Sequence, residues 1–158
     1  MIMFYVPEDE NLLAILGEIT LRHEHMNHIL KMTIKSLANI TPAQAIDALK
    51  YTGSAELRKR INKLAKNKLQ EGQALLKLQA ILTRAERLTE QRNKLIHGLW
   101  AQELNGESGL HNIPGEIEPI PSQDELKQLA CDIKTLTEEL NRERLEGFLK
   151  TALEEKLK

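Results

Sequence analysis

The chain has 158 residues, of which 41% are hydrophobic and 28% charged, and its 22 basic and 23 acidic side chains give a net charge of −1. A charge so close to zero excludes a strongly basic nucleic-acid carrier and a polybasic protein of the membrane surface, although it leaves room for a local basic patch. Aromatic residues make up only 3% of the chain, whereas helix-favouring Leu, Lys, Glu, Ala and Gln dominate. The composition therefore predicts an all-α protein, and the length predicts one domain over residues 1–158.

The N-terminal segment and the single cysteine bear on the cellular compartment. Residues 1–6 are apolar, but they lack the basic stretch and the small-residue cleavage site of a signal peptide. No apolar stretch of the sequence approaches the ~20 residues that a transmembrane helix needs. Cys131 lies in an apolar helical run, which predicts a small core residue in a reducing compartment. We therefore expect a cytoplasmic protein that does not bind membranes.

Helical periodicity organises the first part of the chain. Apolar residues at spacings of three and four predict a long helix over residues 8–38. Thr41, Pro42 and Gln44 have the pattern of an N-cap, a first-turn proline and a capping-box glutamine. They predict a short helix that ends near Lys50.

The next helix is basic and is followed by a long leucine-rich one. Ser54 is the predicted N-cap of a helix over residues 55–69. Gly72 either ends this helix or bends it, and the sequence leaves both alternatives open. The leucine-rich helix that follows should end near Gly98, a residue suited to a left-handed C-terminal cap.

Residues 100–121 interrupt the helical pattern with three prolines and three glycines. The Asn105-Gly106 dipeptide is typical of hairpin turns, so residues 100–113 are candidates for a small two-stranded excursion. A loop of this length inside a compact domain is more often functional than idle.

Ser122 and Glu125 form a second predicted capping box, which opens a last helix that runs to about Leu153. The complete pattern predicts an antiparallel helical bundle of about four to five helices, with a short loop or hairpin excursion near residues 100–121.

One segment of the leucine-rich helix carries the residues best suited to chemistry. At about 100° per residue, Arg92, Asn93 and His97 share one arc of the helix. The guanidinium of Arg92 suits a phosphate, His97 can transfer a proton near neutral pH, and Asn93 can orient the imidazole. Such a set could cleave a phosphodiester without a metal ion. The alternative is a polar cluster that ties the helix end to its neighbours.

The arrangement of Arg92, Asn93 and, after three residues, His97 near the end of a long helix resembles the signature of HEPN domains. The resemblance covers this motif and the all-α fold class, and it does not extend to the rest of the chain. It implies either a metal-independent endoribonuclease that acts as a homodimer, with two motif copies facing each other, or an inactive member that binds a nucleotide or a partner protein.

Toxin members of that family that pair with a nucleotidyltransferase antitoxin typically carry a tyrosine two residues after the motif histidine. This chain has Leu99 there, which argues against regulation by modification of that tyrosine. A toxin–antitoxin or phage-defence role, with a cognate antitoxin or regulatory protein, remains a further alternative.

The leading interpretation is a cytoplasmic, homodimeric ribonuclease that needs no cofactor. One His97 would deprotonate the RNA 2′-hydroxyl, and the second would protonate the leaving 5′-oxygen. Arg92 would hold the phosphate and Asn93 would orient His97. The products would carry a 2′,3′-cyclic phosphate and a 5′-hydroxyl.

Candidate RNA-binding residues lie outside this motif. Arg58, Lys59, Arg60 and Lys63 begin a basic run that predicts either a patch tracking the RNA backbone or a solvated helix face. Trp100, the only tryptophan, could stack on a base or could plug the end of the bundle.

The first helix contains three histidines that raise the question of a metal site. His23 and His28 are five residues apart, which separates them around the helix and disfavours a shared metal ion. His23 lies in the apolar stripe, which predicts an interior histidine, and we expect no metal. Glu24 could support the site by pairing with Arg92 or orienting His97, if the two helices pack together.

Overall fold

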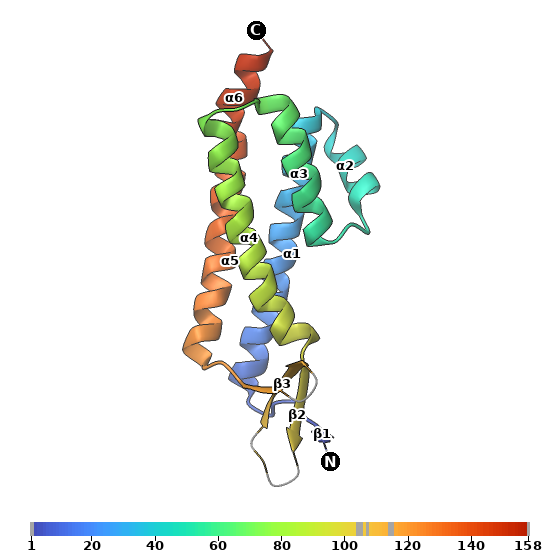
Figure 1. The fold of residues 1–158 in the computed structure, drawn as a ribbon, viewed down its shortest axis with the longest axis vertical. Helices are drawn as coiled ribbons and strands as arrows, with labels where there is room; N and C mark the ends of the chain where they lie inside the picture. The colour runs from blue at the N-terminus through green and yellow to red at the C-terminus, as the bar shows by residue number, and fades with distance from the viewer. Residues whose placement is uncertain (1, 104–105, 107, 114–115, 158) are drawn as a thin grey trace.

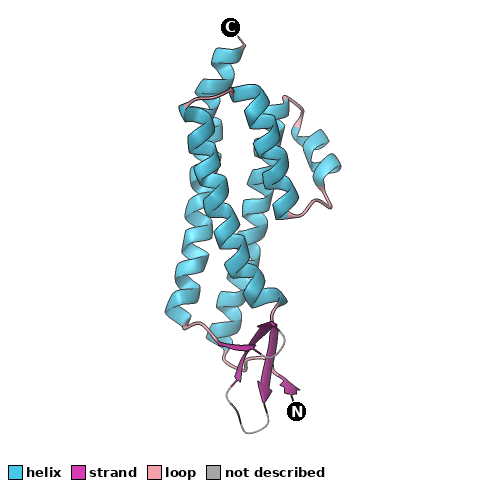
Figure 2. Cartoon of the chain, in the orientation of Figure 1, coloured by secondary structure: helices cyan, strands magenta, loops and turns pink. Residues whose placement is uncertain are grey.

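The computed structural model describes residues 2–103, 106, 108–113 and 116–157. It is a bundle of helices with a small four-stranded sheet at one end (Figure 1, Figure 2). The bundle confirms the predicted helical class, and the sheet is larger than the predicted excursion. The helices are α1 (Glu10–Ala38), α2 (Pro42–Leu49), α3 (Ser54–Leu69), α4 (Gln73–His97), α5 (Gln123–Leu145) and α6 (Phe148–Lys156). The strands are β1 (Ile2–Phe4), β2 (Leu99–Glu103), β3 (Ser108–Ile113) and β4 (Glu116–Pro119).

The long helices do not simply alternate in direction. Both α1 and α5 begin at the sheet end and run the same way, and α4 runs back toward the sheet (Figure 1). The Gln123 amide donates to the Asp9 carboxylate at 2.9 Å, so the N-terminal ends of α1 and α5 lie together. The predicted antiparallel order is therefore wrong for this pair. The reason is α2, which returns the chain along the outside of the bundle so that α3 again runs in the direction of α1 (Figure 1).

The core consists of the apolar stripes that the three-four spacing predicts. Ile19, Met26 and Leu30 of α1 are fully buried, as are Leu136 and Leu140 of α5. Helix α1 packs against α3, α4 and α5, so it is the central element of the bundle. Burial of such side chains is the main driving force for the fold.

Both predicted capping boxes are confirmed. The Thr41 hydroxyl accepts from the Gln44 backbone at 3.2 Å, and the Gln44 side chain accepts from the Thr41 backbone at 2.9 Å. Ser122 and Glu125 make the same reciprocal pair at 3.2 and 2.8 Å. These contacts fix where α2 and α5 begin.

Three helix ends differ from the sequence-based expectation. Ser54 is the first residue of α3 and not its N-cap, because its hydroxyl bonds to a neighbouring helix instead. Gly72 lies between α3 and α4, so it belongs to a true break and not to a bend. Gly98 has a φ of −66° and is not left-handed, because the chain enters β2 directly.

The predicted last helix is divided in two. Its helical hydrogen bonding is interrupted at Glu146 and Gly147, between α5 and α6. Cys131 is exposed on α5, so the expectation that it fills the core is wrong. No described helix is both long enough and apolar enough to span a bilayer.

The sheet has the order β1-β2-β3-β4, and all neighbours are antiparallel. The β2–β3 pair confirms the predicted two-stranded excursion, although Asn105 of the expected turn lies outside the described residues. Strand β1 adds an unexpected edge, with Phe4 opposite Ala101. The Trp100 Nε1 donates to the carbonyl of Leu95 at 2.7 Å, which ties β2 to the end of α4.

Candidate active site

The three motif residues lie in the last two turns of α4 and contact one another. Arg92 Nη1 donates to Asn93 Oδ1 at 3.1 Å and lies 3.1 Å from His97 Nε2. Since a guanidinium has no acceptor, the His97 nitrogen must face it with its lone pair. His97 is exposed, whereas Arg92 and Asn93 are half-buried. Asn93, which we expected to orient His97, therefore binds Arg92 instead.

These side chains border a cavity of about 510 Å³. This size is within the range of small-ligand sites. Three elements form its walls: the middle of α1, the start of α3 and the end of α4. The polar and charged wall residues are His23, Glu24, Asn27, Ser54, Glu56, Arg58, Thr89, Glu90, Arg92, Asn93 and His97. We call this space the motif cavity.

A polar network lies beneath the motif residues and joins the three helices. His23 is buried, and its Nε2 lies 3.1 Å from the Thr89 hydroxyl. Ser54 donates to Asn27 Oδ1 at 2.5 Å, and its hydroxyl is 3.5 Å from the same His23 nitrogen. Arg58 Nη1 donates to the Thr89 hydroxyl at 3.5 Å. The prediction that His23 is an interior histidine is confirmed.

The surroundings of His23 lower its pKa from 6.5 to about 4. Burial is the largest cause, because it penalises the charged imidazolium. The neighbouring Arg92, Arg58 and His97 side chains lower the pKa further, and the Glu24 carboxylate opposes them. His23 is therefore neutral at neutral pH and belongs to the scaffold of the cavity.

Two guanidinium groups face the motif cavity, those of Arg58 and Arg92. Within the described ranges, no carboxylate oxygen lies within 4.0 Å of either one. Cations without a paired anion in a concave site attract anionic ligands. Glu24 lies in the same wall, as expected if the helices pack together, but the described part of the chain contains no hydrogen bond from it to Arg92 or His97.

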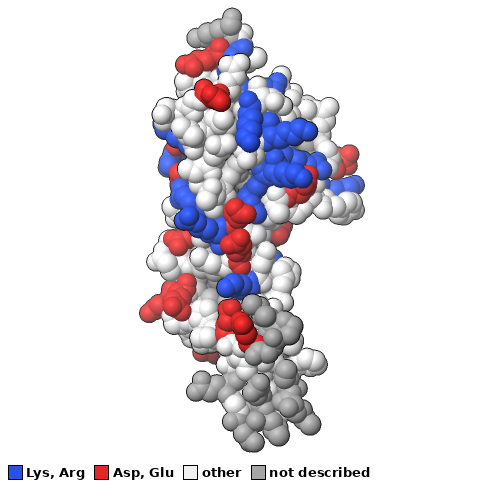
Figure 3. Space-filling model, viewed as in Figure 1, with Lys and Arg blue, Asp and Glu red and all other residues white. Residues whose placement is uncertain are grey.

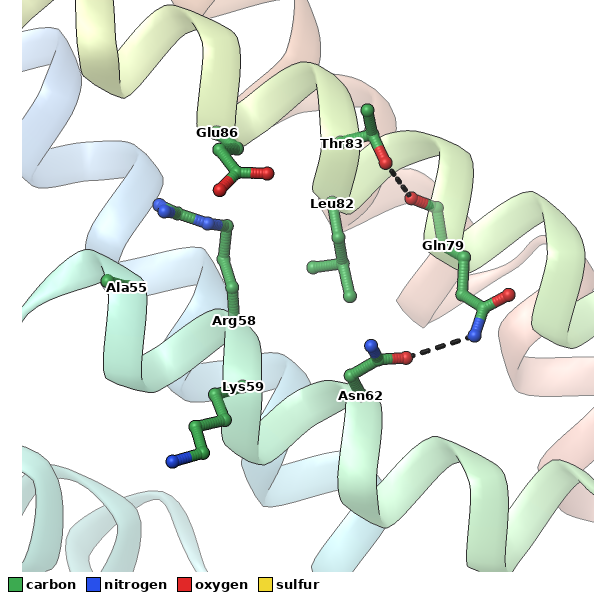
Figure 4. A pocket seen from close by; sticks show the side chains of 8 residues that line it. All are labelled: Ala55, Arg58, Lys59, Asn62, Gln79, Leu82, Thr83 and Glu86. Carbon is green, nitrogen blue, oxygen red and sulfur yellow. Dashed lines mark hydrogen bonds between the residues drawn. The ribbon is translucent and has the colours of Figure 1, made fainter.

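The basic run divides between cavity walls and solvent. Arg58 and Lys59 line a second cavity between α3 and α4, of about 530 Å³ (Figure 4). Arg60 pairs with Glu56 at 3.1 Å, and Lys63 is exposed and lines neither cavity. Lys and Arg side chains gather over α3 on the face drawn in Figure 3. The structure thus brings only Arg58 from this run to the motif residues.

Trp100 lies outside the motif cavity. Its ring is half-buried and packs against the hydrophobic core, and its ring nitrogen bonds to the end of α4. The contacts of this residue are those of a plug at the end of the bundle.

The remaining histidines of α1 do not gather around a common point. His25 and His28 are exposed, while His23 is buried. Among the residues that the structure describes, no three His, Cys, Asp or Glu side chains are grouped closely enough to hold a metal ion.

Three residues of the network were not predicted from the sequence: Asn27, Ser54 and Thr89. A signal for two of them exists in the helical spacing. Asn27 follows His23 by four residues and Thr89 precedes Asn93 by four, so each shares a helix face with a residue already singled out. Ser54 has no such signal, because its role depends on how α3 packs on α1.

The chain matches no protein-family model, no curated protein and no solved structure. The functional argument therefore rests on the motif residues and the geometry around them.

Proposed function

We propose that this chain is a metal-independent endoribonuclease of the HEPN type, which acts as a homodimer. The observation that carries the proposal is the contact of Arg92 Nη1 with both Asn93 Oδ1 and His97 Nε2, each at 3.1 Å, at the border of the motif cavity. A guanidinium that can bind an anion, beside an accessible imidazole that can transfer a proton, suits the cleavage of a phosphodiester.

The reaction begins at the ribose 2′-hydroxyl. His97 Nε2 takes its proton, and the 2′-oxygen attacks the adjacent phosphorus. The bond from phosphorus to the 5′-oxygen breaks, and that oxygen receives a proton from a second acid. The products are a 2′,3′-cyclic phosphate and a 5′-hydroxyl. Arg92 stabilises the negative charge that builds up on the phosphate, since its planar fork suits phosphate oxygens.

Asn93 fixes the direction of the Arg92 guanidinium through the 3.1 Å hydrogen bond. When a phosphate binds Arg92, it competes with His97 for the same donor and releases the imidazole lone pair for the 2′-hydroxyl. Asn93 is therefore a positioning residue for Arg92.

The second acid needs a source outside the single chain. The other histidine of the motif cavity, His23, has a pKa of about 4 and is buried, so it is neutral at neutral pH and does not supply an acidic imidazolium. A second copy of His97, from a two-fold partner, would supply the acid. This division of roles supports a dimer with a composite site.

An apolar surface next to His97 supports such a dimer. Leu99, two residues after His97, is 42% exposed, and Phe4 on the adjacent strand is 85% exposed. Phe4 pairs with Ala101, so Phe4 and Leu99 project from the same face of the sheet. Two chains joined through this face would bring their Leu99 residues close together, and His97 precedes Leu99 by only two residues.

The catalytic test compares wild type with His97→Ala and Arg92→Ala on mixed RNA in excess EDTA. We expect each variant to lose at least ~100-fold in cleavage rate. His25→Ala is the matched control, because His25 is exposed on α1 and does not line the motif cavity. Equal activity of His97→Ala and wild type, or activity that EDTA removes, would refute the mechanism. A wild type that never cleaves RNA but gains thermal stability with a nucleotide would indicate a binding module instead.

The composite site is tested by mixing wild type with inactive His97→Ala chains in varied proportions at a constant total protein concentration. If each site needs two His97 side chains, activity follows the square of the wild-type fraction, so an equal mixture retains about one quarter. A linear decrease would mean that each chain carries a complete site. Mass spectrometry of the fragments of a cleaved RNA oligonucleotide identifies the cyclic phosphate end.

A further inference from the structure

The second cavity, between α3 and α4, has the features of a binding site for a flat polar ligand (Figure 4). Leu82 forms its apolar inner wall. At one end, Gln79 Nε2 donates to Asn62 Oδ1 at 3.1 Å, which holds the two amides in place. The Arg58 side chain and the Glu86 carboxylate lie at the other end (Figure 4).

We propose that this cavity is a subsite for one RNA base next to the cleaved phosphodiester, and that it selects a base with an amino group over one with a carbonyl group at the same position, cytosine over uracil. The inference rests on the proposed ribonuclease function, and it names a determinant of its substrate.

The position of the cavity connects it to the motif cavity. Ala55 and Arg58 line both spaces, so the two are neighbours along the same surface. Arg58 also donates to Thr89, whose hydroxyl contacts His23 beneath the motif residues. A nucleotide with its phosphate near Arg58 could therefore place its base in one cavity and the next phosphate in the other.

The chemistry of the walls favours a base over a second phosphate. Arg58 and Lys59 also line this cavity, but Glu86 would repel a phosphate at its own end, and within the described ranges no Lys, Arg or His nitrogen is within 4.0 Å of its carboxylate. The apolar Leu82 offers a surface for the face of a ring. The volume of about 530 Å³ accommodates a ligand of nucleotide size.

The free hydrogen-bonding groups determine which base fits. The amide nitrogen of Asn62 points toward the cavity in Figure 4, while its oxygen already accepts from Gln79. The Glu86 carboxylate only accepts. Cytosine can offer its amino donor to the Glu86 carboxylate, as glutamate commonly accepts from that group, while the Asn62 amide at the other end can donate to the ring carbonyl that both pyrimidines carry. Uracil would set a carbonyl oxygen against the carboxylate, which leaves two acceptors unmatched.

The experiment measures binding without cleavage. In the His97→Ala background, the affinities for oligocytidylate and oligouridylate of equal length are compared by fluorescence anisotropy at one salt concentration. We expect oligocytidylate to bind about fivefold more tightly or better. Glu86→Gln should bring the ratio close to one, because an amide can donate to uracil as well as accept from cytosine.

Glu90→Gln is the matched control. It removes the same charge from the next turn of α4, where Glu90 lines the motif cavity but not the second cavity. We expect it to raise both affinities alike and to keep their ratio. Asn62→Leu should lower the affinity for oligocytidylate, with the thermal unfolding midpoint measured to confirm that the variant is folded.

The outcomes separate the two proposals. A preference for cytosine that Glu86→Gln removes and Glu90→Gln keeps supports the subsite, even if the wild type never cleaves RNA. Equal affinities, no binding, or a preference that Glu86→Gln leaves unchanged overturns the subsite. Cleavage by the wild type with any of these results would leave the ribonuclease proposal standing.

Discussion

The buried His23 should make the stability of the protein depend on pH. Its pKa is about 4 in the folded chain and 6.5 in the unfolded one, so the unfolded state binds its proton first as the pH falls. The stabilising effect is complete above pH 6.5 and is lost as the pH falls toward 4. The difference between these pKa values corresponds to about 3 kcal/mol over the whole range, of which about 2 kcal/mol is lost between pH 7.5 and pH 5.

The assay is urea unfolding of wild type and His23→Gln at a series of pH values between about 7.5 and 5, where most carboxylates stay ionised. We expect the free energy of unfolding to fall by about 2 kcal/mol more in wild type than in His23→Gln. His25→Gln, an exposed change on the same helix, should behave as wild type. If wild type and His23→Gln lose stability in parallel, the protonation of His23 does not oppose folding and the reasoning is refuted.

Three further predictions concern the framework of the site. Ser122→Ala removes one half of the α5 capping box and should cost about 1 kcal/mol in urea unfolding. Leu136→Ala opens a hole in the fully buried core and should cost about 2–5 kcal/mol in the same assay. Gly98→Ala would force a methyl group onto the Lys94 carbonyl, so it should lower the thermal midpoint and reduce RNA cleavage together; an unchanged midpoint would contradict the tight packing.

Local patterns predicted the helices because their signals lie within a few residues. The capping boxes at Thr41 and Ser122 are such signals, and both occur as expected. The direction of the helices depends on distant parts of the chain. The sequence pattern of α2 predicts one more short helix of the bundle. In the structure, α2 carries the chain back along the outside, so that α1 and α3 run in the same direction (Figure 1). Strand β1 was equally hidden, because three residues are too few for an alternating pattern and it forms only by pairing with β2.

The same contrast holds in the site. Arg92, Asn93 and His97 were found because one helix brings them together, but the hydrogen bonds of Arg92 to Asn93 and His97 are not the i,i+4 contact that helical spacing predicted between Asn93 and His97. The contact of Ser54 with Asn27, and that of His23 with Thr89, join helices far apart in the sequence. Such contacts depend on packing register, which periodicity along one helix does not determine.

The sheet also explains how an exposed residue at a helix end can hold a defined position. His97 is the last residue of α4, where helices usually fray. Here the next residues are fixed in β2, because Gly98 N donates to Lys94 at 3.1 Å and Trp100 donates to Leu95 at 2.7 Å. These two bonds satisfy carbonyls that the helix leaves open and prevent the last turn from unwinding. The imidazole of His97 is thus accessible to a substrate, while the backbone of His97 is held by the strands. The non-helical segment after α4 therefore positions the reactive side chain.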